Sequence, residues 1–465
     1  MADQTREIVL EALLALERGE EFSHRLLKAV LDKYDYLESR DKAFIKRVTE
    51  GTIERQLELD YYLNAFSTVP VGRMKPLIRC LLRMSVYQLL YMDTVPDSAV
   101  CNEACKLAEK RKFRNLKGFV NGVLRNIVKN KNSLPLPDKE KNPAEYLSVK
   151  YSMPQWLVDM WLDEYGREGT VTLLEGLLQI HPVSLRFKST LPEEERETYL
   201  TMLQKTGAEL KQSAYLPYVY TGTNIEGIGT LPGFAEGAFT VQDVSSALAV
   251  TAAGIKAGDF VMDICAAPGG KSILAAEKAE RVLARDVSES KIALIEENLE
   301  RMQVSNVTTQ VSDATVADAA YTQQADVLIM DVPCSGLGVM GKKRDIKYHA
   351  SYESIESIVE LQRRIVKNSW QYVKPGGILL YSTCTINRTE NEDMVRWISD
   401  NFPFEPVSLS EDLPEKLLSE VRDCRARLPK TSDLPEELRA ACIQLLPGFM
   451  STDGFFFAKL RRRQD

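Results

Sequence analysis

Apolar residues recur every three or four positions through the first 130 residues, as in Val9, Leu13 and Leu16. This spacing places them on one face of an amphipathic helix. The same periodicity continues through several further segments, and no stretch of alternating apolar and polar residues interrupts it. We therefore predict an all-α domain over residues 1–130.

After this region the pattern breaks and then changes. Pro135 and Pro137 interrupt it, because proline can neither continue a helix nor donate a hydrogen bond to a sheet, so we place a linker over residues 131–144. Residues 183–187 then alternate apolar and polar side chains, which indicates a half-buried strand. Helical and strand-like segments are mixed here, so we predict a small α+β module over residues 145–236.

From residue 237 onward, short apolar strands are separated by helical segments. This spacing is typical of βαβ units in a largely parallel sheet. We therefore predict an α/β domain over residues 237–465, with a further late strand at 454–460. The other strands are predicted at 239–242, 260–264, 281–286, 307–311, 325–331 and 377–383.

Composition limits the class of protein. A chain of 465 residues is too long for one ordinary core, and 44% hydrophobic with 27% charged residues is usual for a globular protein. No apolar run approaches the roughly 20 residues of a membrane span. The first residues lack the basic and then apolar order of a signal peptide. We expect a cytoplasmic protein that does not enter a membrane, and a monomer.

Cysteine and histidine usage bears on redox state and metals. The eight cysteines are scattered along a long chain, which indicates reduced thiols rather than a disulfide framework. The sequence contains no Cys-x-x-Cys pair, and no histidine pair lies near Cys101 and Cys105 to complete a zinc site. We therefore expect no metal site.

The charge distribution is uneven although the net charge is −7. Eight lysines and arginines lie between residues 110 and 131 without one acidic residue among them. Such a block can neutralise several phosphates, whereas most charge runs only form a solvated helix face. We predict RNA contact in this block. The residues assigned to it are Lys110, Arg111, Lys112, Arg114, Lys117 and Arg125.

The stretch VMDICAAPGGKS, residues 261–272, joins an apolar strand to an apolar helix through a glycine turn. In an α/β sheet such a turn presents backbone N–H groups to a nucleotide-like ligand. Its spacing is not the Gly-x-Gly-x-x-Gly of a dinucleotide site. Asp286, Asp313 and Asp331 follow at later strand ends, where carboxylates can bind ribose hydroxyls or an adenine amino group. One such Asp would be explained as a helix cap, but three indicate a nucleoside ligand.

Two later strands each end in a cysteine. ADVLIMDVPCSG places Cys334 after one strand, and GGILLYSTCT places Cys384 after another. Both are expected to face the cleft at the carboxyl ends of the sheet. A thiolate there could form a covalent intermediate with a substrate, provided that its pKa is lowered or a proton acceptor lies nearby. A single cysteine would more often be a small buried hydrophobic residue.

The motifs AAPGGK, DVPCSG and STCT, in this order and spacing, resemble those of the RsmB (Fmu/Sun) family of bacterial ribosomal RNA cytosine-5 methyltransferases. The resemblance covers nearly the whole chain. KGFVNGVLRNI is similar to the last helices of a NusB-like RNA-binding domain, and LPGFMSTDGFFFAKL to the family's C-terminal signature. It implies three parts: an all-α NusB-like domain, a ferredoxin-like α+β module, and a Rossmann-like class I methyltransferase domain whose last strand is antiparallel.

The resemblance also implies S-adenosylmethionine as the cofactor and S-adenosylhomocysteine as its product. Carbon 5 of cytosine is a poor nucleophile until a thiolate adds to carbon 6. The mechanism alone does not decide which cysteine supplies the attacking thiolate. In cytosine-5 DNA methyltransferases it is the cysteine of the Pro-Cys motif. In the RNA family the Thr-Cys thiol adds and the Pro-Cys thiol assists release, which implies Cys384 as nucleophile and Cys334 as release assistant. The implied cofactor residues are Cys265, Ala266, Ala267, Pro268, Gly269, Gly270, Lys271, Asp286, Asp313 and Asp331.

Between the two cysteines lies a basic run, and basic side chains beside a cleft can hold the phosphates that flank an extruded base. Lys342, Lys343 and Arg344 are expected to do so, in a loop that is mobile before RNA arrives. The resemblance implies small-subunit ribosomal RNA as the substrate. A cytosine-5 methyltransferase for transfer RNA and a catalytically silent ribosome-assembly factor are the alternatives.

Overall fold

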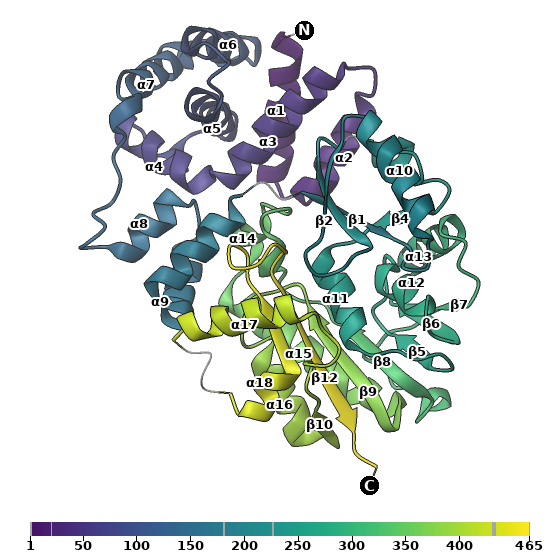
Figure 1. Cartoon of the computed structure of the whole chain (residues 1–465). Helices are drawn as coiled ribbons and strands as arrows, with labels where there is room; N and C mark the ends of the chain where they lie inside the picture. Colours follow the sequence, from purple (N-terminus) through teal and green to yellow (C-terminus); the bar gives the residue numbers. More distant parts are fainter. Residues whose placement is uncertain (1, 20, 180–181, 226, 430–433, 465) are drawn as a thin grey trace. The chain divides into compact units, whose positions relative to one another are not determined.

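The structure is a computed structural model that describes residues 2–19, 21–179, 182–225, 227–429 and 434–464 (Figure 1). The chain divides into two compact units. One unit consists of Met1–Val171 together with Lys342–His349, and the other of Thr172–Gly341 together with Ala350–Asp465.

The first unit is built from helices, as predicted for residues 1–130. Helix α5 carries apolar residues at helical spacing and forms the centre of the unit. Its residues Leu81, Leu82 and Met84 are fully buried. Helix α5 packs against α1, α3, α6 and α7, and Figure 1 shows it end-on among its neighbours. The helices are α1 (Ala2–Glu17), α2 (Ser23–Lys33), α3 (Ser39–Glu54), α4 (Gln56–Phe66), α5 (Pro76–Tyr91), α6 (Asp97–Lys110), α7 (Lys117–Lys129), α8 (Pro143–Lys150), most of α9 (Gln155–Leu177), and α14 (Ile346–His349).

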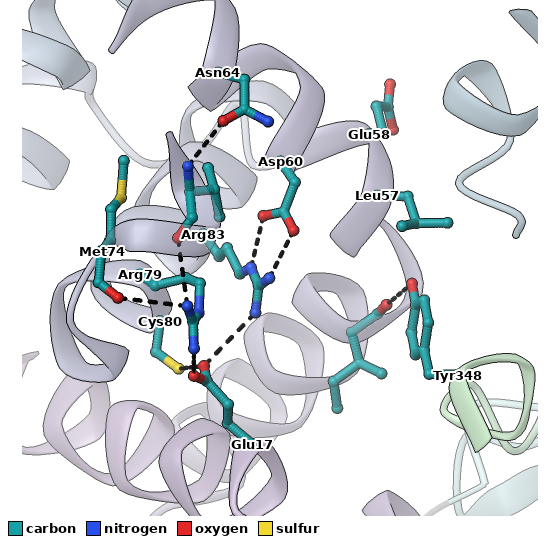
Figure 2. Close-up of polar contacts among 12 residues, drawn as sticks. Glu17, Leu57, Glu58, Asp60, Asn64, Met74, Arg79, Cys80, Arg83 and Tyr348 are labelled. Atoms are coloured by element: carbon teal, nitrogen blue, oxygen red, sulfur yellow. Dashed lines mark hydrogen bonds and ion pairs between the residues drawn. The ribbon is translucent and has the colours of Figure 1, made fainter. Parts of the chain in front are cut away.

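A polar network ties α1, α4 and α5 together (Figure 2). Arg83 donates two hydrogen bonds to Asp60, at 2.7 and 2.6 Å, and lies 3.7 Å from Glu17. Glu17 also pairs with Arg79 and accepts a hydrogen bond from the Cys80 thiol at 2.9 Å. Burial raises the pKa of Asp60, and the guanidinium of Arg83 opposes that shift. Each buried charge therefore has a partner of opposite sign within the same unit.

The second unit contains a four-stranded antiparallel sheet in the order β2-β3-β1-β4. Its elements are β1 (Val183–Phe187), α10 (Glu193–Lys205), β2 (Glu209–Gln212), β3 (Val219–Thr223) and β4 (Phe239–Val241). The strand at β4 was expected in the α/β sheet, and this expectation is wrong: β4 pairs with β1 through Phe239 opposite Phe187. The two rings lie 5.3 Å apart in the core of the small sheet, so the small sheet extends beyond residue 236.

The larger sheet has the order β10-β12-β9-β8-β5-β6-β7, with β11 paired to β12. Strands β5 to β9 are mutually parallel, and β12 runs antiparallel beside β9, as predicted for the last strand (Figure 1). Strand β5 is entirely buried, as expected for the middle of a sheet with helices on its faces. The strands are β5 (Phe260–Asp263), β6 (Arg281–Asp286), β7 (Val307–Val311), β8 (Ala325–Asp331), β9 (Val373–Thr383), β10 (Phe404–Pro406), β11 (Cys442–Leu445) and β12 (Phe455–Arg462).

The strand order reverses between β5 and β8. The chain runs outward from β5 through β6 to β7 and then returns to place β8 on the other side of β5. Open parallel sheets bind ligands at such a switch point, outside the carboxyl ends of the strands. The helices around this sheet are α11 (Val244–Ala252), α12 (Gly270–Ala276), α13 (Glu289–Arg301), α15 (Tyr352–Ser369), α16 (Glu392–Asn401), α17 (Glu415–Arg427) and α18 (Glu436–Ala441). None of the helices that the structure describes has the length and apolar character to cross a membrane.

Two glycines of the helical unit should respond in opposite ways to alanine. A Cβ on Gly51 in α3 would overlap the Tyr87 ring, whereas a Cβ on Gly122 in α7 would meet no atom within 4 Å. Gly51→Ala should lower the free energy of unfolding by about 1–3 kcal/mol through overpacking. Gly122→Ala should raise it by about 0.5–1 kcal/mol through helix propensity. Urea unfolding followed by circular dichroism measures both, and equal effects of the two substitutions would contradict the packing described.

Candidate active site

The turn between β5 and α12 is shaped by glycine and by backbone hydrogen bonds. Gly269 has φ 99° and immediately precedes α12, a left-handed conformation that favours glycine. A Cβ at this position would also lie 3.2 Å from the Ile295 side chain in α13. The N–H of Ala266 donates to the carbonyl of Arg285 at 2.9 Å. The turn is therefore fixed between two elements and keeps its backbone at the carboxyl edge of the sheet.

Asp286 ends β6 and holds this turn. Its carboxylate accepts hydrogen bonds from the N–H of Ala267 at 3.0 Å and from Lys291 Nζ at 2.9 Å. Asp313 follows β7 and is exposed, and hydrogen bonds from the hydroxyl and the N–H of Thr315 lower its pKa. Because β6 and β7 are adjacent parallel strands, both acids lie along one edge of the sheet.

Asp331 ends β8 and has a partner on each carboxylate oxygen. Oδ2 accepts from Lys271 Nζ and Oδ1 from Ser382 Oγ, both at 2.7 Å. Lys271 also lies over the ring of Phe455, 5.2 Å from its centroid. Lys271 thus connects the glycine turn to the end of β8 through an ion pair and to the last strand β12 through a cation–π contact. Each carboxylate oxygen of Asp331 can still accept one further hydrogen bond, so a ligand donor can bind without loss of these contacts.

The two cysteines expected at the site lie side by side, with their sulfur atoms 3.2 Å apart. Parallel pairing of β8 with β9 sets Asp331 opposite Ser382, and the N–H of Val332 donates to the Ser382 carbonyl at 3.1 Å. This register brings Cys334 and Cys384 together although 49 residues separate them in the sequence. The hydrogen bond with the Cys384 sulfur and burial both raise the pKa of the Cys334 thiol. Because the two sulfur atoms are in hydrogen-bond contact, the thiols titrate as a pair and one proton can bridge them.

The loop that carries Cys334 is held by a buried acid that the sequence analysis did not single out. Glu390 accepts from the N–H of Ser335 at 2.8 Å and from its hydroxyl at 2.5 Å. Gln362 donates to the carbonyl of Pro333 at 2.9 Å, and Tyr381 donates to the carbonyl of Glu390 at 2.7 Å. Burial raises the pKa of Glu390. Its hydrogen bonds to Ser335 distinguish Glu390 from Glu392 and Asp393, and nothing in the sequence does.

The residues around the turn suit a nucleoside-containing cofactor. Gln242 Oε1 is buried and has no hydrogen-bond partner among the described residues, and Gln242 lies 3.4 Å from the position of a Cβ on Gly270. An acceptor left open beside the turn can receive a donor from a ligand. The sequence analysis missed Gln242, because nothing in its neighbourhood marks it before the fold brings it to the turn. Burial raises the pKa of Cys265, which keeps that thiol protonated and unreactive.

Most of the basic block over 110–131 is paired with acids from elsewhere in the helical unit. The partners are acids of α1 and α6, which a count within the block does not include; one of them, Asp97, lies 3.5 Å from Lys131. Lys112 and Arg125 are exposed and have no acidic partner in the described part of the chain. The pairs are Lys110 with Glu7 at 2.6 Å, Arg111 with Glu11, Arg114 with Glu109 at 3.3 Å and Lys117 with Glu109 at 2.8 Å.

The basic run between the cysteines is not the free loop that was expected. Arg344 pairs with Glu50 and with Glu54, both at 2.8 Å, and residues 346–349 form the short helix α14. Lys342 and Lys343 are exposed. The expectation of mobility is wrong for Arg344 because two acids of α3 fix its side chain in the helical unit.

Comparisons with known proteins agree with this arrangement. A sequence model of the family described as 16S rRNA methyltransferase RsmB/F matches residues 250–461, and one of the NusB family matches residues 3–129. The chain is 33% identical to the "Probable ribosomal RNA small subunit methyltransferase B" of Bacillus subtilis (strain 168), over 98% of both chains. It is 29% identical to the ribosomal RNA small subunit methyltransferase B of Salmonella typhi, again over 98% of both. The crystal structure of PH0851 is similar with a TM-score of 0.77 and 25% identity, over 98% of each chain.

Asp263, the last residue of β5, should make stability depend on pH. It is fully buried and accepts a hydrogen bond from Ser272 at 2.7 Å, and burial raises its pKa to about 7. A raised carboxyl pKa stabilises the folded state at low pH, and this contribution is lost as pH rises through the folded pKa. The free energy of unfolding of Asp263→Asn, taken relative to that of the wild type, should therefore rise by about 1.4 kcal/mol per pH unit between pH ~4 and ~7. Urea unfolding at pH 5, 6 and 7 measures it, and a constant difference would contradict the raised pKa.

Proposed function

Because the chain belongs to the 16S rRNA methyltransferase RsmB/F family, we propose that it methylates carbon 5 of a cytosine in small-subunit ribosomal RNA, with S-adenosylmethionine as the methyl donor. The observation that carries this proposal is the pair of sulfur atoms, Cys334 and Cys384, 3.2 Å apart at the ends of adjacent parallel strands. The NusB-like helical unit supplies RNA binding, with the exposed Lys112 and Arg125 as cations open to phosphate.

Cys384 is the nucleophile of the proposed reaction. Its thiolate adds to carbon 6 of the cytosine, forming a C–S bond and moving electron density to carbon 5. When bound, S-adenosylmethionine supplies an electrophilic methyl group on a sulfonium sulfur. Once carbon 5 carries the methyl group, loss of its proton and cleavage of the C–S bond restore the aromatic ring and return Cys384 as a thiolate.

Cys334 has two roles that follow one another. In the free enzyme the hydrogen bond between the two sulfur atoms raises the pKa of Cys334, and we assign the thiolate of the pair to Cys384. After Cys384 has become a thioether, it carries no negative charge, so this cause of the raised pKa of Cys334 disappears. Cys334 can then release its proton to solvent, and its thiolate takes the proton from carbon 5 as the C–S bond breaks and its electrons return to Cys384. The assignment of Cys384 as nucleophile and Cys334 as assistant rests on the resemblance of STCT and DVPCSG to the motifs of the family.

The cofactor is assigned to the turn from Cys265 to Lys271 and to the acids at three strand ends. Asp286 would accept hydrogen bonds from the ribose hydroxyls, and Asp313 from the adenine amino group. Asp331, held by Lys271 and Ser382, lies beside the cysteine strand and would orient either the cofactor or the cytosine. Three carboxylates disfavour the phosphates of a dinucleotide, which agrees with the absence of the Gly-x-Gly-x-x-Gly spacing from the turn.

Replacement of the two cysteines should separate their roles. With labelled S-adenosylmethionine and unmodified 16S ribosomal RNA, Cys384→Ala should abolish methyl transfer and form no protein–RNA adduct. Cys334→Ala should form the adduct and accumulate it, because release is slowed. Denaturing gel electrophoresis detects the adduct. The matched control is Cys424→Ala, a buried cysteine of α17, which should keep wild-type activity.

The opposite pattern of adducts would exchange the two cysteines. Methyl transfer to transfer RNA but not to ribosomal RNA would keep the chemistry and replace the substrate. Cofactor binding without transfer to any RNA would instead support a catalytically silent assembly factor.

Asp286→Ala should weaken cofactor binding. Loss of charge-assisted hydrogen bonds to the ribose and of the contact with Ala267 should raise the dissociation constant of S-adenosylmethionine by about tenfold to a hundredfold. Isothermal titration calorimetry measures it. Glu300→Ala removes an exposed carboxylate from α13 and should leave the constant unchanged. Equal binding by wild type and Asp286→Ala would contradict this assignment.

A further inference from the structure

The two residues that precede α16, Glu390 and Asn391, are both fully buried. Burial of an acid and an amide is costly unless hydrogen bonds satisfy them, so the partners of these side chains are informative. The backbone of both residues is fixed within its own loop. The N–H of Glu390 donates to the carbonyl of Asn387 at 3.2 Å, and that of Asn391 to the carbonyl of Arg388 at 3.1 Å.

Glu390 holds the residues on both sides of Cys334. Its carboxylate accepts from the N–H and from the hydroxyl of Ser335, the residue that follows Cys334, at 2.8 and 2.5 Å. It also accepts from Gln362 Nε2 at 3.3 Å. The same amide nitrogen donates to the carbonyl of Pro333, the residue that precedes Cys334, at 2.9 Å. The short loop that carries Cys334 is therefore fixed at both of its neighbouring residues.

Asn391 holds the residues on both sides of Cys384 in the same way. Its Oδ1 accepts from the hydroxyl of Thr383 at 2.6 Å, and its Nδ2 donates to the carbonyl of Thr385 at 3.1 Å. An asparagine directly before a helix ordinarily caps that helix with its side chain, but Asn391 makes no such bond to α16. Its amide is bonded to the end of the cysteine strand instead.

A pair of hydroxyl groups joins the two cysteine loops. Ser335 Oγ and Thr385 Oγ1 lie 2.8 Å apart, and each belongs to the residue that follows one of the cysteines. A hydroxyl group has a single proton. Because Ser335 donates its proton to Glu390, the proton between the two hydroxyls comes from Thr385. All of these residues belong to one compact unit, so their arrangement is set within that unit alone.

We propose that Glu390 and Asn391 are positioning residues for the two cysteines. Asn391 holds Cys384 where its sulfur attacks carbon 6. Glu390 holds Cys334 where its thiolate takes the proton from carbon 5. Each acts through the residues next to its cysteine rather than by contact with the reacting atoms. The proposal rests on the covalent function proposed above, and it assigns one positioning residue to each step.

The lifetime of the protein–RNA adduct tests the role of Glu390. Glu390→Ala should accumulate adduct, as Cys334→Ala does, and slow its decay by about tenfold to a hundredfold, because misplacement of a reacting group by about 1 Å has effects of this size. In the Cys334→Ala background, Glu390→Ala should not lengthen the lifetime further, since the group that it positions is already absent. Denaturing gel electrophoresis of samples quenched at successive times measures the decay.

Glu390→Gln is the conservative variant. Its amide oxygen can accept from the N–H of Ser335, and its NH2 group can donate to the Ser335 hydroxyl, which then donates its own proton to Thr385. Both contacts are kept, so the adduct lifetime should stay close to that of the wild type. Ser335→Ala removes only the hydroxyl and should lengthen the lifetime, which decides the test if Glu390→Ala does not fold. Asp400→Ala, at an exposed acid of α16, is the control and should change nothing.

The rate of adduct formation tests the role of Asn391. In the Cys334→Ala background, at saturating RNA and cofactor, Asn391→Ala should slow adduct formation by about tenfold. The final amount of adduct and the dissociation constant of S-adenosylmethionine should not change. Asp400→Ala in the same background should keep the parent rate.

Adduct decay at the wild-type rate in Glu390→Ala and Ser335→Ala, or adduct formation at the parent rate in Asn391→Ala, would overturn the corresponding role and leave the covalent chemistry intact. Equal lifetimes in Glu390→Gln and Glu390→Ala would assign the effect to lost charge and also overturn positioning by Glu390. A smaller final amount of adduct at unchanged rates, which indicates loss of folded protein, would do the same. Absence of adduct in the Cys334→Ala parent would overturn the proposed function itself.

Discussion

The contact between the Cys334 and Cys384 sulfur atoms is the interaction on which the site depends. Neither sulfur is placed by its own local sequence. The parallel register of β8 and β9 sets the spacing of the two strand ends, and the buried Glu390 fixes the loop after β8 through Ser335. A slip of the register by one residue would turn every side chain of one strand to the other face and separate the pair.

Both units bury polar groups that reduce the stability of the protein. Asp263, Glu390 and Lys347 all have pKa values moved by burial toward their neutral forms. Each therefore disfavours folding at some pH, and each lies near the turn, the cysteine loop or the segment after it. Such costs are typical of sites where geometry matters more than stability.

Much of the fold could be predicted from the sequence because the relevant signals are local. Apolar runs predicted the bounds of the parallel strands to within a few residues. Helical periodicity predicted that the first domain is all-α. Strand β4 was assigned to the wrong sheet because its apolar residues fit either sheet, and only pairing with β1 decides. Strand β2 was not predicted because an exposed edge strand needs no apolar alternation. At the site, the motifs indicated the cysteines and the three strand-end acids, but Glu390 and Gln242 become visible only through burial and long-range contacts.

Charge counting along the sequence failed in the same way. The block over 110–131 contains no acid, yet α1 and α6 bring glutamates to four of its cations. Arg344 was grouped with exposed cations but is bound to α3. Cations neutralised in this way release fewer counterions on binding a nucleic acid, so their count overstates the electrostatic part of RNA affinity. Within the helical unit, two acids of α3 bind Arg344, and Ser23 of α2 donates to Asp345.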